Sequence, residues 1–301
     1  ALLAPDASRR TVVHGAGALA AAVTLGATTA PTRAIEGIYE TGANYSFVLW
    51  AHGCPDFRMW SETMAGLYKD DFAALNDTPA ASAVRHTLVG SPGRPVGILS
   101  IAPTDAVPAL AKWYLGGAGG LRDAGLQEGW LAEPVRVNSF TPSLCLGAGA
   151  LPRQLDPGTA VLFCAHAGDR AKRDELLRAP ETAALLTESG VVTAYAGYAP
   201  ADGTDSRAGQ AGAAHLLRDK GAAEAFAARA WDPEGEVVRG LVDRGVVAGP
   251  LYVEPVEVYL DFIRPSLADP TAVTFARVDL PPEEEPSVLE GPQGGADQEG
   301  D

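Results

Sequence analysis

The stretch Tyr45-Ser-Phe-Val-Leu-Trp50 is short, continuous and rich in β-branched and aromatic residues, and this composition predicts a buried β-strand. It ends at Ala51-His52-Gly53-Cys54-Pro55. From Phe57 to Leu75 the apolar residues recur at steps of three and four, which predicts an amphipathic helix. A strand followed by a helix in this way is typical of α/β proteins.

Strands and helices continue to alternate towards the C-terminus. Residues 206–229 are rich in Ala, Leu, Arg and Glu and are predicted to be helical, with Gly221 as a break. Pro255 places the strand predicted over 252–263 at an edge or interrupts it. The fold class is therefore mixed α/β or α+β, with short strands alternating with amphipathic helices. The other predicted strands are 96–101, 160–163, 191–198 and 271–280, and the other predicted helices are one capped by Thr104 and Asp105 that runs towards Gly116, and those over 169–178, 180–189 and 236–244.

Composition divides the chain into three parts. Residues 1–30 are rich in Ala and Gly and are expected either to pack as an arm or to act as an export signal, because Arg9 and Arg10 precede an apolar run as in twin-arginine signals. Residues 31–280 are expected to form one globular α/β domain, with two lobes divided near residue 150 as the alternative. Residues 281–301 hold seven acids and no base, which predicts a disordered acidic tail.

Charge limits the classes of partner. The net charge of -15 argues against a surface built throughout to bind phosphate. Local basic clusters remain as candidates for nucleic-acid binding, because Arg side chains bind phosphate in bidentate fashion. No apolar run is long enough to predict a membrane span, so no membrane partner is expected. The candidate nucleic-acid-binding residues are Arg9, Arg10, Arg170, Lys172 and Arg173.

Two short stretches share a strand that ends in Ala-His and is soon followed by Gly, at 48–53 and 161–168. In an Ala-rich chain we attribute this similarity to chance. Within or directly after each stretch a His and a Cys lie two residues apart, but ligands so spaced on an extended strand rarely chelate one zinc ion, so no metal is expected. A Cys/His pair could instead serve an enzyme as nucleophile and base. The residues concerned are His52, Cys54, Cys164 and His166.

The composition carries a resemblance. With 54 Ala, 23 Pro and 12 Ser among 301 residues, close to three in ten, and no catalytic motif, the chain resembles the proline-alanine-serine-rich proteins of polymycoviruses. In that family of fungal double-stranded RNA viruses the protein associates with the genomic RNA and coats it. The resemblance therefore implies a viral structural protein; a conventional capsid or coat subunit of another double-stranded RNA virus is the neighbouring interpretation.

The sequence thus favours a non-enzymatic viral protein that self-assembles and contacts double-stranded RNA through limited Arg patches. No cofactor is expected, and the location would be a viral particle or a ribonucleoprotein in the host cytoplasm. The alternative is a bacterial α/β protein, exported or cytosolic, that acts as an enzyme through one of the Cys/His pairs. The two interpretations differ in their partner, which is a macromolecule in the first and a small molecule in the second.

Overall fold

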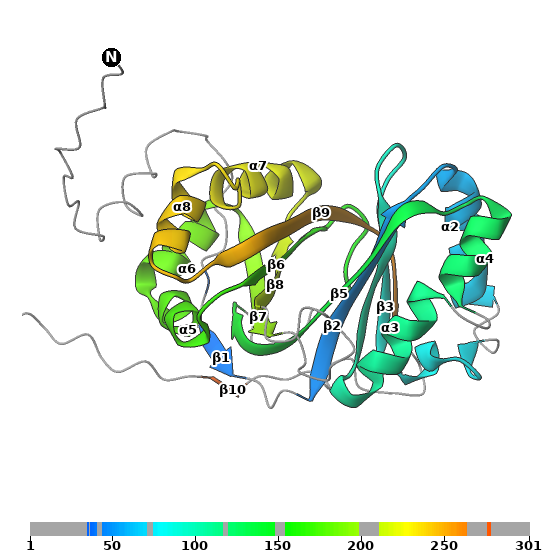
Figure 1. Ribbon diagram of the computed structural model, residues 1–301, viewed down its shortest axis with the longest axis horizontal. Helices are drawn as coiled ribbons and strands as arrows, with labels where there is room; N and C mark the ends of the chain where they lie inside the picture. Colours follow the sequence, from blue (N-terminus) through cyan, green and yellow to red (C-terminus); the bar gives the residue numbers. More distant parts are fainter. Residues whose placement is uncertain are drawn as a thin grey trace, which may run out of the picture.

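The fold consists of two consecutive copies of one unit, residues 45–146 and 160–263, which we call the first and the second repeat (Figure 1). The structure, a computed structural model, describes residues 35, 37–40, 44–70, 75–116, 120–147, 154–198, 211–263, 276 and 277. Each repeat has the order strand, helix, strand, strand, helix, strand, in which one or two helical segments fill each helical position. This βαββαβ order is the ferredoxin-like motif.

The strands of the two repeats have 5 to 16 residues and the α-helices 8 to 11. The first repeat comprises β2 (Tyr45–Gly53), α2 (Phe57–Ala65), the π-helix η1 (Gly66–Asp70), the 3₁₀ helix η3 (Pro79–Ser82), β3 (Arg85–Val89), β4 (Val96–Pro103), the 3₁₀ helix η4 (Thr104–Ala106), α3 (Val107–Leu115), α4 (Leu121–Glu128) and β5 (Ala132–Leu146). The second comprises β6 (Ala160–Ala167), α5 (Arg170–Arg178), α6 (Pro180–Glu188), β7 (Val191–Tyr198), β8 (Ala211–Leu217), α7 (Lys220–Ala230), α8 (Glu236–Asp243) and β9 (Ala248–Ile263). Outside both lie β1 (Ile38–Glu40) and β10 (Ala276–Arg277).

The eight strands of the repeats close into an antiparallel barrel. Within the repeats the strand orders are β5-β2-β4-β3 and β9-β6-β8-β7, so the same order occurs twice. The pairings β3 with β9 and β5 with β7 join the two sheets at both sides. Closure leaves each of these strands a neighbour on both sides, which removes the exposed edges that promote aggregation. The short strand β1 pairs with β5 and with β10 outside this ring.

Helices cover the outside of the barrel, and aspartates begin three of them. Figure 1 shows α2, α3 and α4 against the first repeat and α5 to α8 against the second. The carboxylates of Asp56, Asp169 and Asp219 accept hydrogen bonds from the amides at the starts of α2, α5 and α7, at 3.0, 3.0 and 2.8 Å. Such caps satisfy amides that the first turn of a helix leaves without partners. Among the residues that the structure describes, no helix combines the length and apolarity needed to cross a bilayer.

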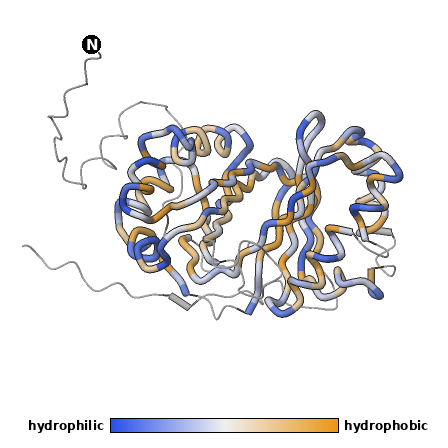
Figure 2. The backbone as a smooth tube through the Cα atoms, viewed as in Figure 1, coloured by the Kyte–Doolittle hydropathy of each residue, from blue (hydrophilic) through white to orange (hydrophobic). Residues whose placement is uncertain are grey.

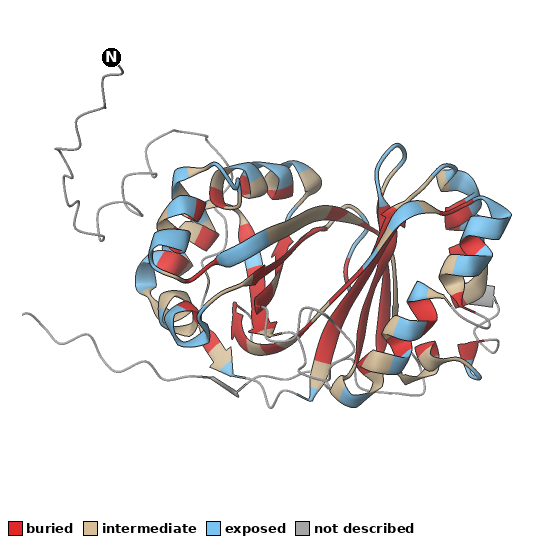
Figure 3. Cartoon of the chain, in the orientation of Figure 1, coloured by how far each residue is buried: buried red, intermediate tan, exposed pale blue. Residues whose placement is uncertain are grey.

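Apolar side chains form a layer inside the barrel and one layer under the helices of each repeat. The strands carry most of the buried residues, whereas the helices expose their outer faces (Figure 3). Along the helices hydrophobic and hydrophilic residues alternate (Figure 2). Inside the barrel Phe47 stacks on Phe140 at 5.2 Å between ring centroids. Representative buried members are Phe47, Phe140 and Phe163 inside, Trp50, Trp60 and Tyr114 under the helices of the first repeat, and Leu162, Leu217 and Phe226 under those of the second.

A buried ion pair joins the repeats where β3 meets β9. The carboxylate of Asp261, whose side chain is fully buried, accepts hydrogen bonds from the Arg85 guanidinium, one of them from Nε at 2.8 Å. Thr87 Oγ1 donates to Asp261 Oδ1, and the Leu155 amide donates to Oδ2, both at 2.8 Å. The Leu155 amide lies in the connection between the repeats. This carboxylate therefore ties together β3, β9 and that connection.

The mixed α/β class is confirmed, although the sheet dominates it. Three predictions are wrong. Not all strands are short, because β5 and β9 have 15 and 16 residues. Residues 206–229 are not one helix, because β8 occupies 211–217. Strand β9 is not an edge strand, since it pairs with β6 and then with β3 along its 16 residues. Pro255 is tolerated because β9 pairs with β6 alone at that point, its pairing with β3 beginning at Val258.

Several predictions fall on residues that the structure does not describe. These are the arm or export signal at 1–30, with Arg9 and Arg10, the acidic tail at 281–301, and all but residues 276 and 277 of the strand expected over 271–280.

Candidate functional site

The register of the strands shows which positions of the two repeats correspond. His52 of β2 lies opposite Val96 of β4, and His166 of β6 lies opposite Ala211 of β8. Both first strands have an irregularity at this histidine in their pairing with the last strand of the repeat. The two Ala-His stretches therefore occupy one and the same place in the repeated unit, so their similarity reflects the repeat and not chance.

Each of these histidines is buried, and its ring is hydrogen-bonded to the backbone carbonyl of the next residue. His52 Nδ1 lies 2.6 Å from the carbonyl oxygen of Gly53, and His166 Nδ1 lies 2.9 Å from that of Ala167. A carbonyl oxygen only accepts, so Nδ1 donates in both rings and Nε2 is the unprotonated acceptor. Burial lowers the pKa of both imidazoles, that of His52 to about 4, so both are neutral at pH 7.

In the first repeat tryptophans fill the space around the histidine. The ring of His52 lies 4.5 Å from that of Trp50 and 6.0 Å from that of Trp130, measured between centroids. Trp60 of α2 closes the cluster at 6.4 Å from His52. All three tryptophans are buried. The first repeat is thus solidly packed at this place.

In the second repeat the corresponding residues are smaller. By register, Cys164 and Ala213 replace the pair Trp50 and Ile98. Val246 replaces Trp130. Each follows a glycine in the left-handed region just after the last helix of its repeat, Gly129 at φ 80° and Gly245 at φ 72°. Ala213 and Val246 line the cavity that results.

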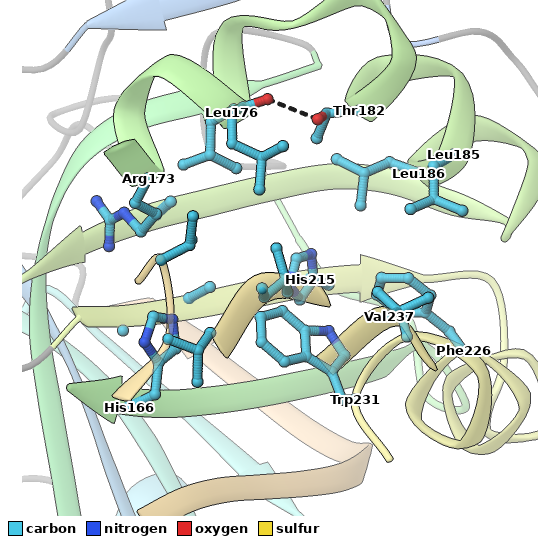
Figure 4. A pocket seen from close by; sticks show the side chains of 18 residues that line it. His166, Arg173, Leu176, Thr182, Leu185, Leu186, His215, Phe226, Trp231 and Val237 are labelled. Atoms are coloured by element: carbon cyan, nitrogen blue, oxygen red, sulfur yellow. Dashed lines mark hydrogen bonds between the residues drawn. The ribbon is translucent and has the colours of Figure 1, made fainter. Parts of the chain in front are cut away.

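This cavity, of about 90 Å³, lies between the outer face of the second sheet and helices α5 to α8 (Figure 4). Its wall is mainly aliphatic and aromatic, and its polar groups are few. The rings of His166 and His215 each lie 6.0 Å from the Trp231 ring between centroids, and Arg173 lies towards one end (Figure 4). The labelled lining residues are His166, Arg173, Leu176, Thr182, Leu185, Leu186, His215, Phe226, Trp231 and Val237.

His215 is the most unusual group in the wall. It is 4% exposed, and neither ring nitrogen has a hydrogen-bond partner among the described residues. Its ring contacts are aromatic, with Phe226 edge-on at 5.2 Å and Trp231 at 6.0 Å between centroids. Burial lowers the pKa of His215 to about 4, so the ring is neutral at pH 7.

At the equivalent strand position of the first repeat, the side chain has hydrogen-bond partners. Ser100 corresponds to His215, because Ser100 lies opposite Val48 and His215 opposite Leu162 in equivalent registers. Ser100 Oγ lies 2.9 Å from His86 Nδ1 and 2.6 Å from the Tyr114 hydroxyl. The first repeat therefore satisfies its polar group at this position, and the second does not.

Two further nitrogens of the cavity wall lack partners among the described residues, Trp231 Nε1 and Arg173 Nε. Both are donors only. The rest of the Arg173 guanidinium is engaged, since it donates to the Gly197 carbonyl and, at 3.1 Å, to Asp174. It also lies 4.0 Å from the centre of the Tyr198 ring. Arg173 thus closes one end of the cavity as a fixed side chain.

Of the Cys/His candidates, only His166 lines the cavity. Burial raises the pKa of the Cys164 thiol well above its usual value, which disfavours the reactive thiolate. Cys54 is half-buried, and burial also raises its pKa. Within the described ranges no hydrogen bond links either of these cysteines to a histidine. The described part of the chain also contains no cluster of three His, Cys, Asp or Glu side chains that could hold a metal ion.

Of the candidate nucleic-acid-binding residues that the structure describes, all lie on α5. Arg173 is buried, and Arg170 stacks on the Tyr198 ring at 4.2 Å. Lys172 lies on the exposed side of the helix. Arg173 therefore does not offer its guanidinium to solvent, because the helix turns it towards the sheet.

His215 and Trp231 were not predicted from the sequence as site residues. The prediction of one helix over 206–229 concealed the strand on which His215 lies. One signal was available: Gly97-Ile-Leu-Ser100 and Gly212-Ala-Ala-His215 occupy equivalent positions, each following its Ala-His strand in the same order.

No protein-family model and no curated protein matches the chain in sequence. Among solved structures, an anthrone oxidase-like protein has 16% identity and a TM-score of 0.45, over 75% of this chain and 96% of that one. A ferredoxin-fold protein from Listeria monocytogenes, described as related to antibiotic biosynthesis monooxygenases, has 10% identity and a TM-score of 0.38, with coverages of 72% and 95%. A heme-binding protein from Thermus thermophilus has 16% identity and a TM-score of 0.34, with coverages of 77% and 95%.

The expectation of an RNA-coating viral structural protein is corrected. The structures named above are described as oxidase-like, monooxygenase-related and heme-binding proteins and not as capsid or coat proteins. The resemblance rested on composition, and the repeats give the alanines another role. Ala213 and Ala196 line the cavity beneath the helices of the second repeat.

Because His215 is buried as a neutral ring, we expect the protein to lose stability in acid. The pKa of His215 is about 4 in the folded protein and about 6.5 in the unfolded chain, so the unfolded chain binds more protons between these values. Stability is then fully present above pH 6.5, falls as the pH drops, and levels off below pH 4. Between pH 7 and pH 4 the free energy of unfolding, measured by urea titration, should fall in both proteins. We expect the fall in His215→Leu to be about 3 kcal/mol smaller than in the unsubstituted protein. Equal losses would show that His215 is not buried as a neutral ring.

Proposed function

We propose that the second repeat binds a small, mainly apolar molecule in the cavity between its sheet and its helices. The observation that carries this proposal is the position of His215, a buried imidazole in the cavity wall with no partner for either nitrogen among the described residues. Ligand pockets in general are apolar spaces with a few placed polar groups, and this cavity has that composition.

The cost of keeping His215 supports a binding role. A buried polar group without a hydrogen bond destabilises a fold by about 1–3 kcal/mol. The first repeat avoids this cost at the equivalent position, where Ser100 is bonded to His86 and Tyr114. A ligand that bonds His215 would offset the cost in the second repeat.

The size of the cavity limits the ligand. An apolar cavity of ~150 Å³ in another protein accepts benzene. At about 90 Å³, the present cavity is suited to a molecule no larger than one six-membered ring. The equivalent place in the first repeat is filled by Trp50, Trp60 and Trp130.

Refilling the cavity tests the proposal. Ala213→Ile introduces the residue that the first repeat has at the equivalent position, Ile98, and adds three carbon atoms to the cavity wall. We expect the affinity for benzene, measured by isothermal titration calorimetry, to fall at least tenfold in this variant. Val242→Ile is the matched control, because Val242 lies on α8 beside the cavity but is 49% exposed.

The control variant should bind benzene as the unsubstituted protein does. Undiminished binding by Ala213→Ile would place the benzene elsewhere, and absence of binding by the unsubstituted protein would contradict the proposed function itself.

A further inference from the structure

We infer that Tyr114 of the first repeat is a redox-active residue. It gives up one electron to a strong one-electron oxidant, such as an oxidised metal complex, while its hydroxyl proton passes to Ser100 and the Ser100 proton passes to His86. A buried hydrogen-bond chain, in which each donor and acceptor can be assigned, carries this inference. It does not rest on the proposed function, because it concerns the first repeat and not the cavity of the second.

The chain runs from the Ala80 carbonyl to the Tyr114 hydroxyl. His86 Nε2 lies 3.2 Å from the Ala80 carbonyl oxygen, which only accepts, so Nε2 donates. In the neutral ring Nδ1 is then the acceptor, and it lies 2.9 Å from Ser100 Oγ. Ser100 therefore donates to His86, and its oxygen accepts from the Tyr114 hydroxyl at 2.6 Å. Both hydroxyl protons thus already point along the chain towards His86.

A proton acceptor within hydrogen-bond reach decides whether a buried tyrosine can be oxidised. Burial raises the pKa of Tyr114, so the phenol keeps its proton until it loses an electron. A phenol that has lost an electron is strongly acidic, so the proton must leave with the electron. Two short transfers, from Tyr114 to Ser100 and from Ser100 to His86, leave a neutral phenoxyl radical and an imidazolium. When an electron returns to the radical, the same two protons move back.

Burial makes the radical difficult to form and strongly oxidising once formed. Tyr114 and Ser100 are fully buried, and His86 is 1% exposed. A buried imidazolium is costly, although its Nε2–H keeps the bond to the Ala80 carbonyl. This cost falls only on the oxidised state, which is why the oxidant must be strong. The same burial keeps solvent and dissolved reductants away from the phenoxyl oxygen.

Tryptophans give the electron a short path from Tyr114 towards the surface. Trp50 is stacked on Tyr114 with 5.1 Å between ring centroids and 6° between the ring planes. The Trp113 ring lies 5.2 Å from that of Tyr114 on its other contact. Trp50 and Tyr114 are fully buried, whereas Trp113 is 9% exposed. Trp113 is therefore the ring of this group through which an oxidant in solution would draw the electron.

The second repeat does not have this arrangement. By register, His215 stands at the position of Ser100 and Cys164 at the position of Trp50. His215 has no hydrogen-bond partner among the described residues. The chain is therefore a feature of one repeat and not a requirement of the repeated fold.

Two other tyrosines also donate to a possible proton acceptor. Tyr198 donates to Asp174 at 2.8 Å, and Tyr252 donates to Glu254 at 3.1 Å. Neither tyrosine is fully buried. A radical on either of them is open to solvent and should decay sooner than one on Tyr114, so these two side chains are the competitors that a test must exclude.

Electron paramagnetic resonance after flash oxidation tests the assignment. The oxidant is tris(bipyridine)ruthenium(III), generated by light in the presence of the full chain, and the sample is frozen after the flash. We expect a tyrosyl signal from the unsubstituted protein that falls by about fivefold or more in Tyr114→Phe, which lacks the hydroxyl proton. The double variant Tyr198→Phe with Tyr252→Phe is the control and should keep the signal.

Ser100→Ala tests the proton path separately. This variant keeps Tyr114 and Trp50 but interrupts the chain to His86, so the tyrosyl signal should again fall by about fivefold or more. The matched control is Ser46→Ala, which removes another fully buried hydroxyl of the first repeat, one that lies 2.7 Å from Thr141 Oγ1. It should keep the signal. Circular dichroism and the melting temperature show whether each variant is folded.

Three results would overturn the inference. The first is the absence of a tyrosyl signal from the unsubstituted protein. The second is a signal that survives in Tyr114→Phe, or that disappears in the double variant, because the radical would then lie on another tyrosine. The third is an undiminished signal in folded Ser100→Ala, or an equal loss in Ser46→Ala, since the chain to His86 would then have no part in the oxidation.

Discussion

Replacing Asp261 with Ala is expected to lower the free energy of unfolding by about 3–5 kcal/mol, the largest single effect that the fold predicts. The substitution leaves the Arg85 guanidinium, whose side chain is 3% exposed, buried beside β9 without its counter-ion. It also removes the acceptor of Thr87 Oγ1 and of the Leu155 amide. The measurement is chemical denaturation followed by far-ultraviolet circular dichroism.

Two controls give this prediction its meaning. Asp156→Ala removes an exposed carboxylate close by in sequence and should change stability by no more than about 0.5 kcal/mol. The double variant Arg85→Met with Asp261→Leu replaces the whole pair by apolar groups and should recover most of the loss. If Asp261→Ala is as stable as Asp156→Ala, the ion pair does not join the repeats in the way described.

Replacing Trp130 with Val is expected to cost about 3 kcal/mol or more, because it creates in the first repeat the space that the second repeat already has. Trp130 is 3% exposed and lies against Trp50 and His52 at 6.5 and 6.0 Å between ring centroids. Nothing near it is free to collapse into the space, since the neighbours are large rings.

At the corresponding position of the second repeat, we expect a larger side chain to be tolerated. Val246→Leu adds one methylene at the corresponding position, where the wall borders the cavity. It should leave the free energy of unfolding within about 1 kcal/mol of its original value. Thermal and urea unfolding of both variants provide the comparison. Equal losses at Trp130 and Val246 would mean that the two repeats are packed alike, with no cavity in the second.

Local sequence patterns predicted the elements in which the apolar residues form a clear run or recur at a regular spacing. Strand β2 and helix α2 follow from the apolar run at Tyr45 and from the three- and four-residue spacing after Phe57. Helices α5 and α6 were also predicted from local signals. In these segments the local preference and the final fold agree.

Strand β8 could not be predicted in this way. Its sequence, Ala211 to Leu217, contains residues that favour helices in isolation, and both faces are largely buried, so no alternation of apolar and polar residues marks it. Its place in the barrel comes from pairing with β6 and β7. Because His215 lies on this strand, the site was not predicted either.

The repeat was visible in the sequence only as a short similarity. The two Ala-His strands share few residues, and the side chains around them differ for a physical reason. The first repeat fills its layer with Trp50 and Trp130, whereas the second has Cys164 and Val246 at those places. The substitutions that make the cavity therefore remove the similarity that would have revealed the repeat.

A crystal structure of the protein under xenon pressure tests the central claim most directly, because xenon enters apolar cavities and is seen as strong electron density. We predict one xenon atom in the second repeat, among Ala213, Val246 and Phe226, and none around His52 in the first. Density in neither place, or around His52 instead, would contradict the account of a packed first repeat and a second repeat open to a ligand.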